Sequence, residues 1–433
     1  MGRTCQKAAA VAAMMFASAA VAQTPPPIDH QRAKDTFAVA HAVSEKDGGR
    51  LWEMKLYGAM FFVNPETRYV VANEPDPQGV LHAEDGLYVG TLPKDVIVSN
   101  APVDWEGKRW TMLMWPIYYG AGPEATIMFG HEMFHRIQPA LHLDAPDLQN
   151  PALDTPEGRL WLQLEWRALA AALVEQGPAR ERAIRDALLF RDHRHALFPG
   201  SAKTEASLEI AEGVPEYTGS MTGSPDYDSA RWRAIAKLAN PDQTITFPRT
   251  FAYTSGPPYG MLLDQRMPGW RKTLTRDSDL GAMLEQTLHG ASNASVEARA
   301  TLYGAALLRI AEADRAAKEA AEKAQYRAAL IDGPTLELPG TGQHFQFSFN
   351  PSAMVSLGEA GAVYPTFHAN AAWGTLDVKQ GVLLPPDFSR AVVAAPKDIK
   401  GPHVEGPGWT LDLAPGWSVV PADRAGSYTL KKA

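Results

Sequence analysis

Residues 130–138 read GHEMFHRIQ and contain the pattern H-E-x-x-H, with His131 and His135 four positions apart. On an α-helix, positions i and i+4 lie about 40° apart around the axis and one turn apart along it. Both imidazoles can therefore approach one metal ion from the same face. Glu132 lies about 100° around the helix from His131, where a carboxylate can act as general base on a metal-activated water. The rest of the fold is predicted around this stretch.

The motif helix is predicted to run from Pro123, which suits a first helical position, to about Gln138. Apolar residues occur on both of its faces, including Ile127 and Met133, which is typical of a buried helix. Buried polar side chains are costly without partners, so two histidines and a glutamate in such a helix favour a bound metal ion over a chance match.

A hydrolytic zinc site needs three protein ligands and one open position. In the extended pattern H-E-x-x-H-x-x-G-x-x-H the third ligand is another histidine. Here Gln138 stands at the glycine position and Leu141 at the third-ligand position, with His142 one residue too late. The third ligand is then expected to be a carboxylate from a second helix. The candidates are Glu165, Glu175, Glu209, Glu212 and Glu216.

Residues 202–218 are predicted to be helical, with an interruption at Pro215. In a regular helix Glu209, Glu212 and Glu216 would fall at i, i+3 and i+7 on one stripe. Like charges on one stripe repel unless a positive charge neutralises them, and a divalent cation would do so. The plain alternative is a solvated acidic face.

A resemblance to a known family bears on the third ligand. The segment AEGVPEY at 211–217, downstream of GHEMFH at 130–135, resembles the gluzincin-type zinc metallopeptidases. In that family a second helix with an E-G-x-A-E-Y segment follows the H-E-x-x-H helix, and its first glutamate completes the zinc site. The resemblance covers only these two motifs. The zinc (Zn²⁺) ligands that it implies are His131, His135 and Glu212.

The resemblance also implies that Glu216 holds a ligating histidine in its tautomer. The chain departs from the family pattern at Pro215, which replaces a small residue and predicts a helix kink just after Glu212. Glu165, on an otherwise well-formed helix predicted at 157–177, is the main rival as third ligand.

The implied activity is hydrolysis of peptide bonds. Zinc lowers the pKa of its bound water toward neutrality and polarises the scissile carbonyl. Glu132 accepts the water proton and passes it to the leaving amine. In related enzymes a tyrosine or histidine farther along the chain stabilises the oxyanion. Tyr253 and Tyr259 fit that order and Tyr253 is our candidate, whereas His193 and His195 are expected at the surface.

Residues 1–22 resemble a secretory signal, with an apolar run at 8–19 and an A-x-A site that predicts cleavage after Ala22. The only cysteine, Cys5, lies inside this signal, so the mature chain is expected to contain no disulfide. These features favour a periplasmic or secreted protein.

The 433 residues carry a formal charge of −8, which predicts no basic patch and no nucleic-acid partner. No stretch beyond the signal is long and apolar enough to predict a stable membrane span. The expected partner is a peptide or protein substrate, and no oligomeric state is predicted.

The predicted fold class is α+β. A zincin-like catalytic domain is expected over 23–330, with a β-rich part at about 50–120 and a helical part at about 121–330. Short alternating runs with many glycines and prolines predict a sandwich-like all-β domain at 331–433.

Several elements can be predicted in more detail. A hairpin is expected from strands at 54–63 and 68–72, and a buried strand at 109–115. As a hypothesis, this strand forms a sheet edge that aligns an extended peptide. Residues 251–260 are expected to lead into a short helix, and 295–329 to form one long exposed helix.

Two other functions remain open. A zincin-like protein without turnover could serve as a binding or scaffold protein of the cell envelope. Alternatively, the C-terminal β domain binds carbohydrate or protein, and the H-E-x-x-H pattern is a coincidence.

Overall fold

The computed structural model describes residues 28–117, 122–148, 150–240, 247–289, 294–340, 346–349 and 353–433. The chain forms two compact units, one within residues 1–39 and 58–118 and the other within 40–57 and 119–433. Helix α1 (His30–Asp47) contributes residues to both units. The predicted signal at 1–22 lies outside the described residues.

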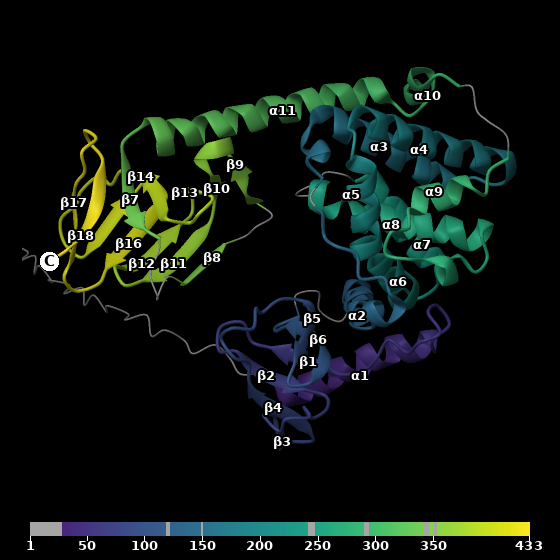
Figure 1. The fold of residues 1–433 in the computed structure, drawn as a ribbon, viewed down its shortest axis with the longest axis horizontal. Helices are drawn as coiled ribbons and strands as arrows, with labels where there is room; N and C mark the ends of the chain where they lie inside the picture. The colour runs from purple at the N-terminus through teal and green to yellow at the C-terminus, as the bar shows by residue number, and fades with distance from the viewer. Residues whose placement is uncertain are drawn as a thin grey trace, which may run out of the picture. The chain divides into compact units, whose positions relative to one another are not determined.

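The first unit contains a six-stranded sheet in the order β3-β4-β2-β1-β6-β5 (Figure 1). The predicted hairpin is present, because β1 and β2 pair antiparallel, although β1 begins only at Met60. A second hairpin joins β5 and β6, and β6 also pairs with β1 in parallel. The strands are β1 (Met60–Val63), β2 (Tyr69–Ala72), β3 (His82–Glu84), β4 (Leu87–Thr91), β5 (Ala101–Trp105) and β6 (Lys108–Met114).

Strand β6 is buried on both faces, as predicted, with Trp110 and Thr111 both inaccessible to solvent. It lies between β1 and β5 and is hydrogen-bonded to both. The hypothesis that it forms the sheet edge is therefore wrong, because its backbone groups are already paired with neighbouring strands.

In the second unit, the described residues between Pro123 and Asp332 form a series of helices, which a C-terminal β region follows, so the chain is a mixed α+β protein. The helices are α2 (Pro123–Ile137), α3 (Pro156–Val174), α4 (Gly177–Leu197), α5 (Ser201–Leu208), α6 (Val214–Gly223), α7 (Tyr227–Ala239), α8 (Phe247–Arg266), α9 (Leu280–Glu285), α10 (Val296–Leu302) and α11 (Ala305–Arg327). Among the described residues, none of the helices combines the length and the apolar character needed to cross a membrane.

Two helical predictions are corrected. The segment 251–260 is part of the 20-residue helix α8, although Pro257 and Pro258 lie inside it. Burial on nearly all sides stabilises this helix and overrides the low helix propensity of proline. The single helix expected at 295–329 is divided at Gly304, which adopts a φ of 76°.

Helices α2 and α6 pack with their backbones in close contact. A Cβ built on Gly130 would lie 2.9 Å from the Cα of Gly219 and would overlap the Thr222 hydroxyl. A Cβ built on Gly219 would overlap the carbonyl oxygen of Ile127, and one on Gly223 would overlap the amide nitrogen of Ile127. Glycine is needed at these positions because only a residue without a side chain permits such an approach.

The C-terminal β region consists of two sheets in the orders β17-β18-β7-β14-β13-β10-β9 and β15-β16-β12-β11-β8. Side chains from both sheets, such as Leu338 of β7 and Leu411 of β16, share one buried core, which is the packing of a sandwich. The strands are β7 (Thr335–Pro339), β8 (Gln346–Phe349), β9 (Val355–Ser356), β10 (Ala362–Tyr364), β11 (Phe367–Ala371), β12 (Gly374–Val378), β13 (Val382–Leu384), β14 (Arg390–Ala394), β15 (His403–Gly406), β16 (Trp409–Leu413), β17 (Trp417–Pro421) and β18 (Tyr428–Lys432).

The contact between α2 and α6 can be tested with Gly219→Ala. The new methyl group meets backbone rather than a movable side chain, so we expect the free energy of unfolding to fall by about 1–3 kcal/mol. Urea denaturation measures this change. Gly90→Ala is the matched control, because there the nearest atom is the end of the Leu81 side chain, 2.8 Å away. Equal stability of both variants would contradict the close backbone packing.

Candidate metal centre

Three potential ligands converge at the contact between α2 and the segment before α6. The Nε2 atoms of His131 and His135 lie 3.0 Å apart. Glu212 Oε2 lies 3.4 Å from each of them. Zinc–ligand distances of about 2.0–2.2 Å in a tetrahedral arrangement imply about 3.3–3.6 Å between ligand atoms, so the two Nε2 atoms would move slightly apart. The three atoms therefore fit a zinc-sized ion with little adjustment.

The hydrogen bonds of the two rings fix their tautomers. Gln138 donates through Nε2 to the carbonyl oxygens of Leu143 and Ile210, so its Oε1 accepts from His135 Nδ1 at 2.8 Å. Glu216 Oε2 accepts from His131 Nδ1 at 3.1 Å. In the neutral rings both Nε2 lone pairs then face each other and the Glu212 carboxylate. Three acceptors aimed at one point are satisfied either by a shared proton or by a metal ion between them.

A π-helical turn from Glu209 to Gly213 separates α5 from α6 and positions Glu212. It is closed by a hydrogen bond from the Val214 amide to the Glu209 carbonyl. Pro215 has no N–H and its ring would crowd the preceding turn of a regular helix, and a wider turn relieves this conflict. The helical path continues through the predicted interruption, and Glu212 remains on it.

The extra residue in this turn separates the glutamates. Glu209 turns to Arg191, which binds both of its carboxylate oxygens at 2.8 and 2.9 Å. Glu212 faces the two histidines, and Glu216 contacts His131 from behind. The expectation that all three glutamates share one stripe is therefore wrong, because it assumed a regular α-helical period.

Helix α8 brings Tyr253 to the same point. A Cβ built on Gly256 would overlap the backbone of Gly213, so this glycine lets α8 approach the π turn. The Tyr253 hydroxyl donates to Glu212 Oε2 at 2.6 Å. Its ring stacks on the ring of His131 with centroids 5.4 Å apart and planes 6° apart. The tyrosine chosen from chain order thus contacts two of the predicted ligands.

The rival residues lie in a separate buried charge cluster. Glu165 is inaccessible to solvent, and its oxygens contact Arg194 Nη2 at 2.7 Å and accept from the Tyr259 hydroxyl at 2.6 Å. His195 binds Glu205 there at 2.8 Å. His193 packs on Trp161 instead. Both histidines are half-buried, so their expected surface placement is wrong.

Glu132 is a third acidic residue at the centre, after Glu212 and Glu216. It is 8% exposed, and its Oε2 has no hydrogen-bond partner among the described residues. Burial raises the pKa of Glu132, although the neighbouring His131 and His135 act in the opposite direction. A buried carboxylate oxygen without a donor is costly, which is the expected property of a group that receives a proton during a reaction.

Charges around His131 oppose the effect of its burial. Burial alone would lower the pKa of His131, but hydrogen bonds with Glu212 and Glu216 raise it to about 10. Burial would raise the pKa of both glutamates, but hydrogen bonds to the histidines hold each well below its usual range. A proton on His131 and a metal ion are therefore alternative ways to satisfy the same acceptors.

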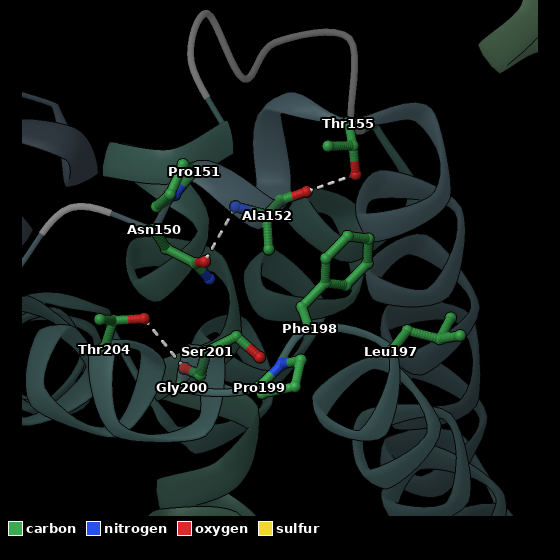
Figure 2. Close-up of a pocket in the computed structure, with 10 residues that line it drawn as sticks. All are labelled: Asn150, Pro151, Ala152, Thr155, Leu197, Phe198, Pro199, Gly200, Ser201 and Thr204. Atoms are coloured by element: carbon green, nitrogen blue, oxygen red, sulfur yellow. Dashed lines mark hydrogen bonds between the residues drawn. The ribbon is translucent and has the colours of Figure 1, made fainter.

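Two other features of the described residues resemble sites. His30, Glu84 and Asp85 form a second group that could hold a metal ion, but both of its carboxylates are exposed to solvent. A pocket of about 550 Å³ lies where α4 meets α5, and Figure 2 shows its mostly apolar lining around Phe198 and Pro199. None of the convergent ligands lines this pocket.

Comparison with known proteins gives no match to a family model, to a curated protein or to a solved structure. The case for a metal centre therefore depends on the geometry of the residues themselves.

Metal binding at this centre should depend on pH. His131 holds a proton below its pKa of about 10, and a metal ion must displace that proton. We expect the affinity for zinc to rise about tenfold per pH unit between pH 6 and 8, with about one proton released per ion. Calorimetric titration in buffers of different ionisation enthalpy measures both quantities. An affinity independent of pH would contradict the assignment of His131 as a ligand.

Proposed function

We propose that this protein is an exported zinc-dependent metallopeptidase with a zincin-like catalytic domain. The observation that carries the proposal is the convergence of three acceptors near Glu132, a buried carboxylate whose Oε2 has no hydrogen-bond partner among the described residues. The two imidazoles have fixed tautomers, and the carboxylate oxygen lies 3.4 Å from each Nε2. The residues proposed to hold zinc are His131, His135 and Glu212.

Zinc bound there supplies Lewis acidity, which polarises a carbonyl group and activates water. Glu132 takes up the proton of the attacking water and delivers it to the leaving amine, and its raised pKa suits both tasks. The Tyr253 hydroxyl stays protonated at neutral pH, because burial and the nearby Glu212 raise its pKa. Its proton is donated to Glu212 Oε2 in this structure, so the hydroxyl would have to turn from that oxygen to donate to the oxyanion at the scissile carbonyl.

The substrate class is a peptide or protein, and the predicted signal at 1–22 directs the enzyme to the periplasm or the medium. Glu216 holds His131 in the tautomer that a metal ligand needs. No role in catalysis is proposed for the C-terminal sandwich.

The proposal is tested by metal content and peptide cleavage of the purified protein. We expect about one zinc ion per chain, lost in His131→Ala. Glu132→Gln should retain zinc and lose about 10²–10⁴-fold in the rate of cleavage of a mixed peptide library. Glu175→Gln, at an exposed glutamate after α3, is the matched control and should cleave normally.

The outcomes separate the candidate functions. If the protein binds zinc but cleaves no peptide, the hypothesis of a zincin-like scaffold protein is favoured over that of an enzyme. Absence of zinc after metal supplementation would reject the centre altogether.

A further inference from the structure

Helix α7 supplies a guanidinium group that contacts both ligand-bearing segments. Arg233 donates through Nε and Nη2 to the two carboxylate oxygens of Glu124, at 2.9 and 2.7 Å. Its third nitrogen, Nη1, donates to Glu216 Oε1 at 3.1 Å. Glu124 belongs to the first turn of α2, and Glu216 belongs to α6. One side chain therefore joins the helix of the two histidines to the helix that follows Glu212.

The contact continues to a proposed zinc ligand. Glu216 Oε1 binds Arg233, and its other oxygen, Oε2, accepts from His131 Nδ1 at 3.1 Å. Arg233 is 17% exposed and Glu216 is 8% exposed at the side chain, so solvent screens the contact between them only weakly, whereas Glu124 at the other end is 54% exposed. A carboxylate fixed at both oxygens has one orientation, which it imposes on the imidazole.

Lys237, one turn along α7, also donates to Glu216 Oε1, at 2.6 Å. Two cationic side chains, Arg233 and Lys237, thus neutralise the charge of Glu216. Only Arg233 reaches Glu124 as well, because the planar guanidinium can bind one carboxylate with two nitrogens and a second carboxylate with the third. Lys237 supplies charge alone, whereas Arg233 supplies charge and a connection between helices.

We propose that Arg233 is a positioning residue of the metal centre, which ties the start of α2 to Glu216 and so holds His131 toward the metal ion. The inference rests on the proposed zinc site. Without Arg233, Lys237 still neutralises Glu216, and the glycine contacts between α2 and α6 still hold the fold. What is lost is the connection between the start of α2 and Glu216, which is one of the contacts that fix the His131 ring, and the result is weaker metal binding.

The test is the zinc affinity of the full-length protein, measured by competition with a chromogenic chelator after metal removal. We expect Arg233→Met to weaken zinc binding about 10–100-fold. Arg233→Lys should lose as much, because it keeps the charge but cannot span both carboxylates. Lys237→Met, which removes the second donor to Glu216 Oε1 but keeps the connection to Glu124, should weaken zinc binding less than Arg233→Met does. Thermal unfolding of each metal-free variant verifies that it is folded at the temperature of the titration.

A double-mutant cycle with Glu124→Gln separates a connection from a general charge effect. Glu124 contacts Arg233 rather than any proposed ligand, yet its substitution should also weaken zinc binding. The double variant Arg233→Met with Glu124→Gln should bind no more weakly than Arg233→Met alone. Additive losses, or a Lys237→Met loss equal to that of Arg233→Met, would overturn the connecting role. An Arg233→Met variant with unchanged affinity would also overturn it.

The result also separates this inference from the proposed function. Wild-type protein that binds no zinc rejects both. If the wild-type protein binds zinc and every variant binds it with the same affinity, only the role of Arg233 is rejected.

Discussion

The backbone contact between Gly130 and Gly219 is the constraint on which the centre depends. The proposed ligands come from two segments, and an ion of this size requires their ligand atoms to lie within about 3.5 Å of one another. Side chains at the contact would hold the helices too far apart, since ordinary helix pairs lie about 8–10 Å apart. Gly213 and Gly256 repeat the arrangement between the π turn and α8, which brings in Tyr253. Glycines thus determine where the polar side chains meet.

The distribution of cations distinguishes the carboxylates by role. A buried charge without a partner is costly, so structural carboxylates are paired. Glu209 has Arg191, and Glu216 has Arg233 and Lys237. Glu212 contacts the two histidines and Tyr253, with no lysine or arginine among its described partners. Of these three glutamates, the one without a lysine or arginine partner is the one that faces the histidines, which is the arrangement expected of a ligand to a metal ion.

The parts of this site that sequence predicts are those with local causes. Helical spacing alone places His131 and His135 on one face. Glu212 was predicted as the third ligand from the family resemblance. A ligand so far from the histidines in sequence cannot be identified from local sequence pattern. The π turn was not predicted, because the α-helical period of 3.6 residues per turn was assumed to continue through Pro215. The interior position of β6 escaped because its parallel partner β1 is distant in sequence, and strand order depends on such long-range pairing. The length of α8 was predicted wrongly because the burial of this helix outweighs the low helix propensity of its prolines.

Tyr253 connects the proposed ligand set to the chemistry. Glu212 Oε2 accepts from the Tyr253 hydroxyl at 2.6 Å and lies 3.4 Å from the Nε2 atom of each histidine, so one oxygen makes all three contacts. The tyrosine therefore orients Glu212 as a ligand through a single oxygen. Its ring is fixed against His131, which keeps the hydroxyl one hydrogen bond from a ligand atom. In the proposed enzyme, a hydroxyl one hydrogen bond from a zinc ligand would be near the substrate carbonyl that zinc would polarise, where negative charge would develop.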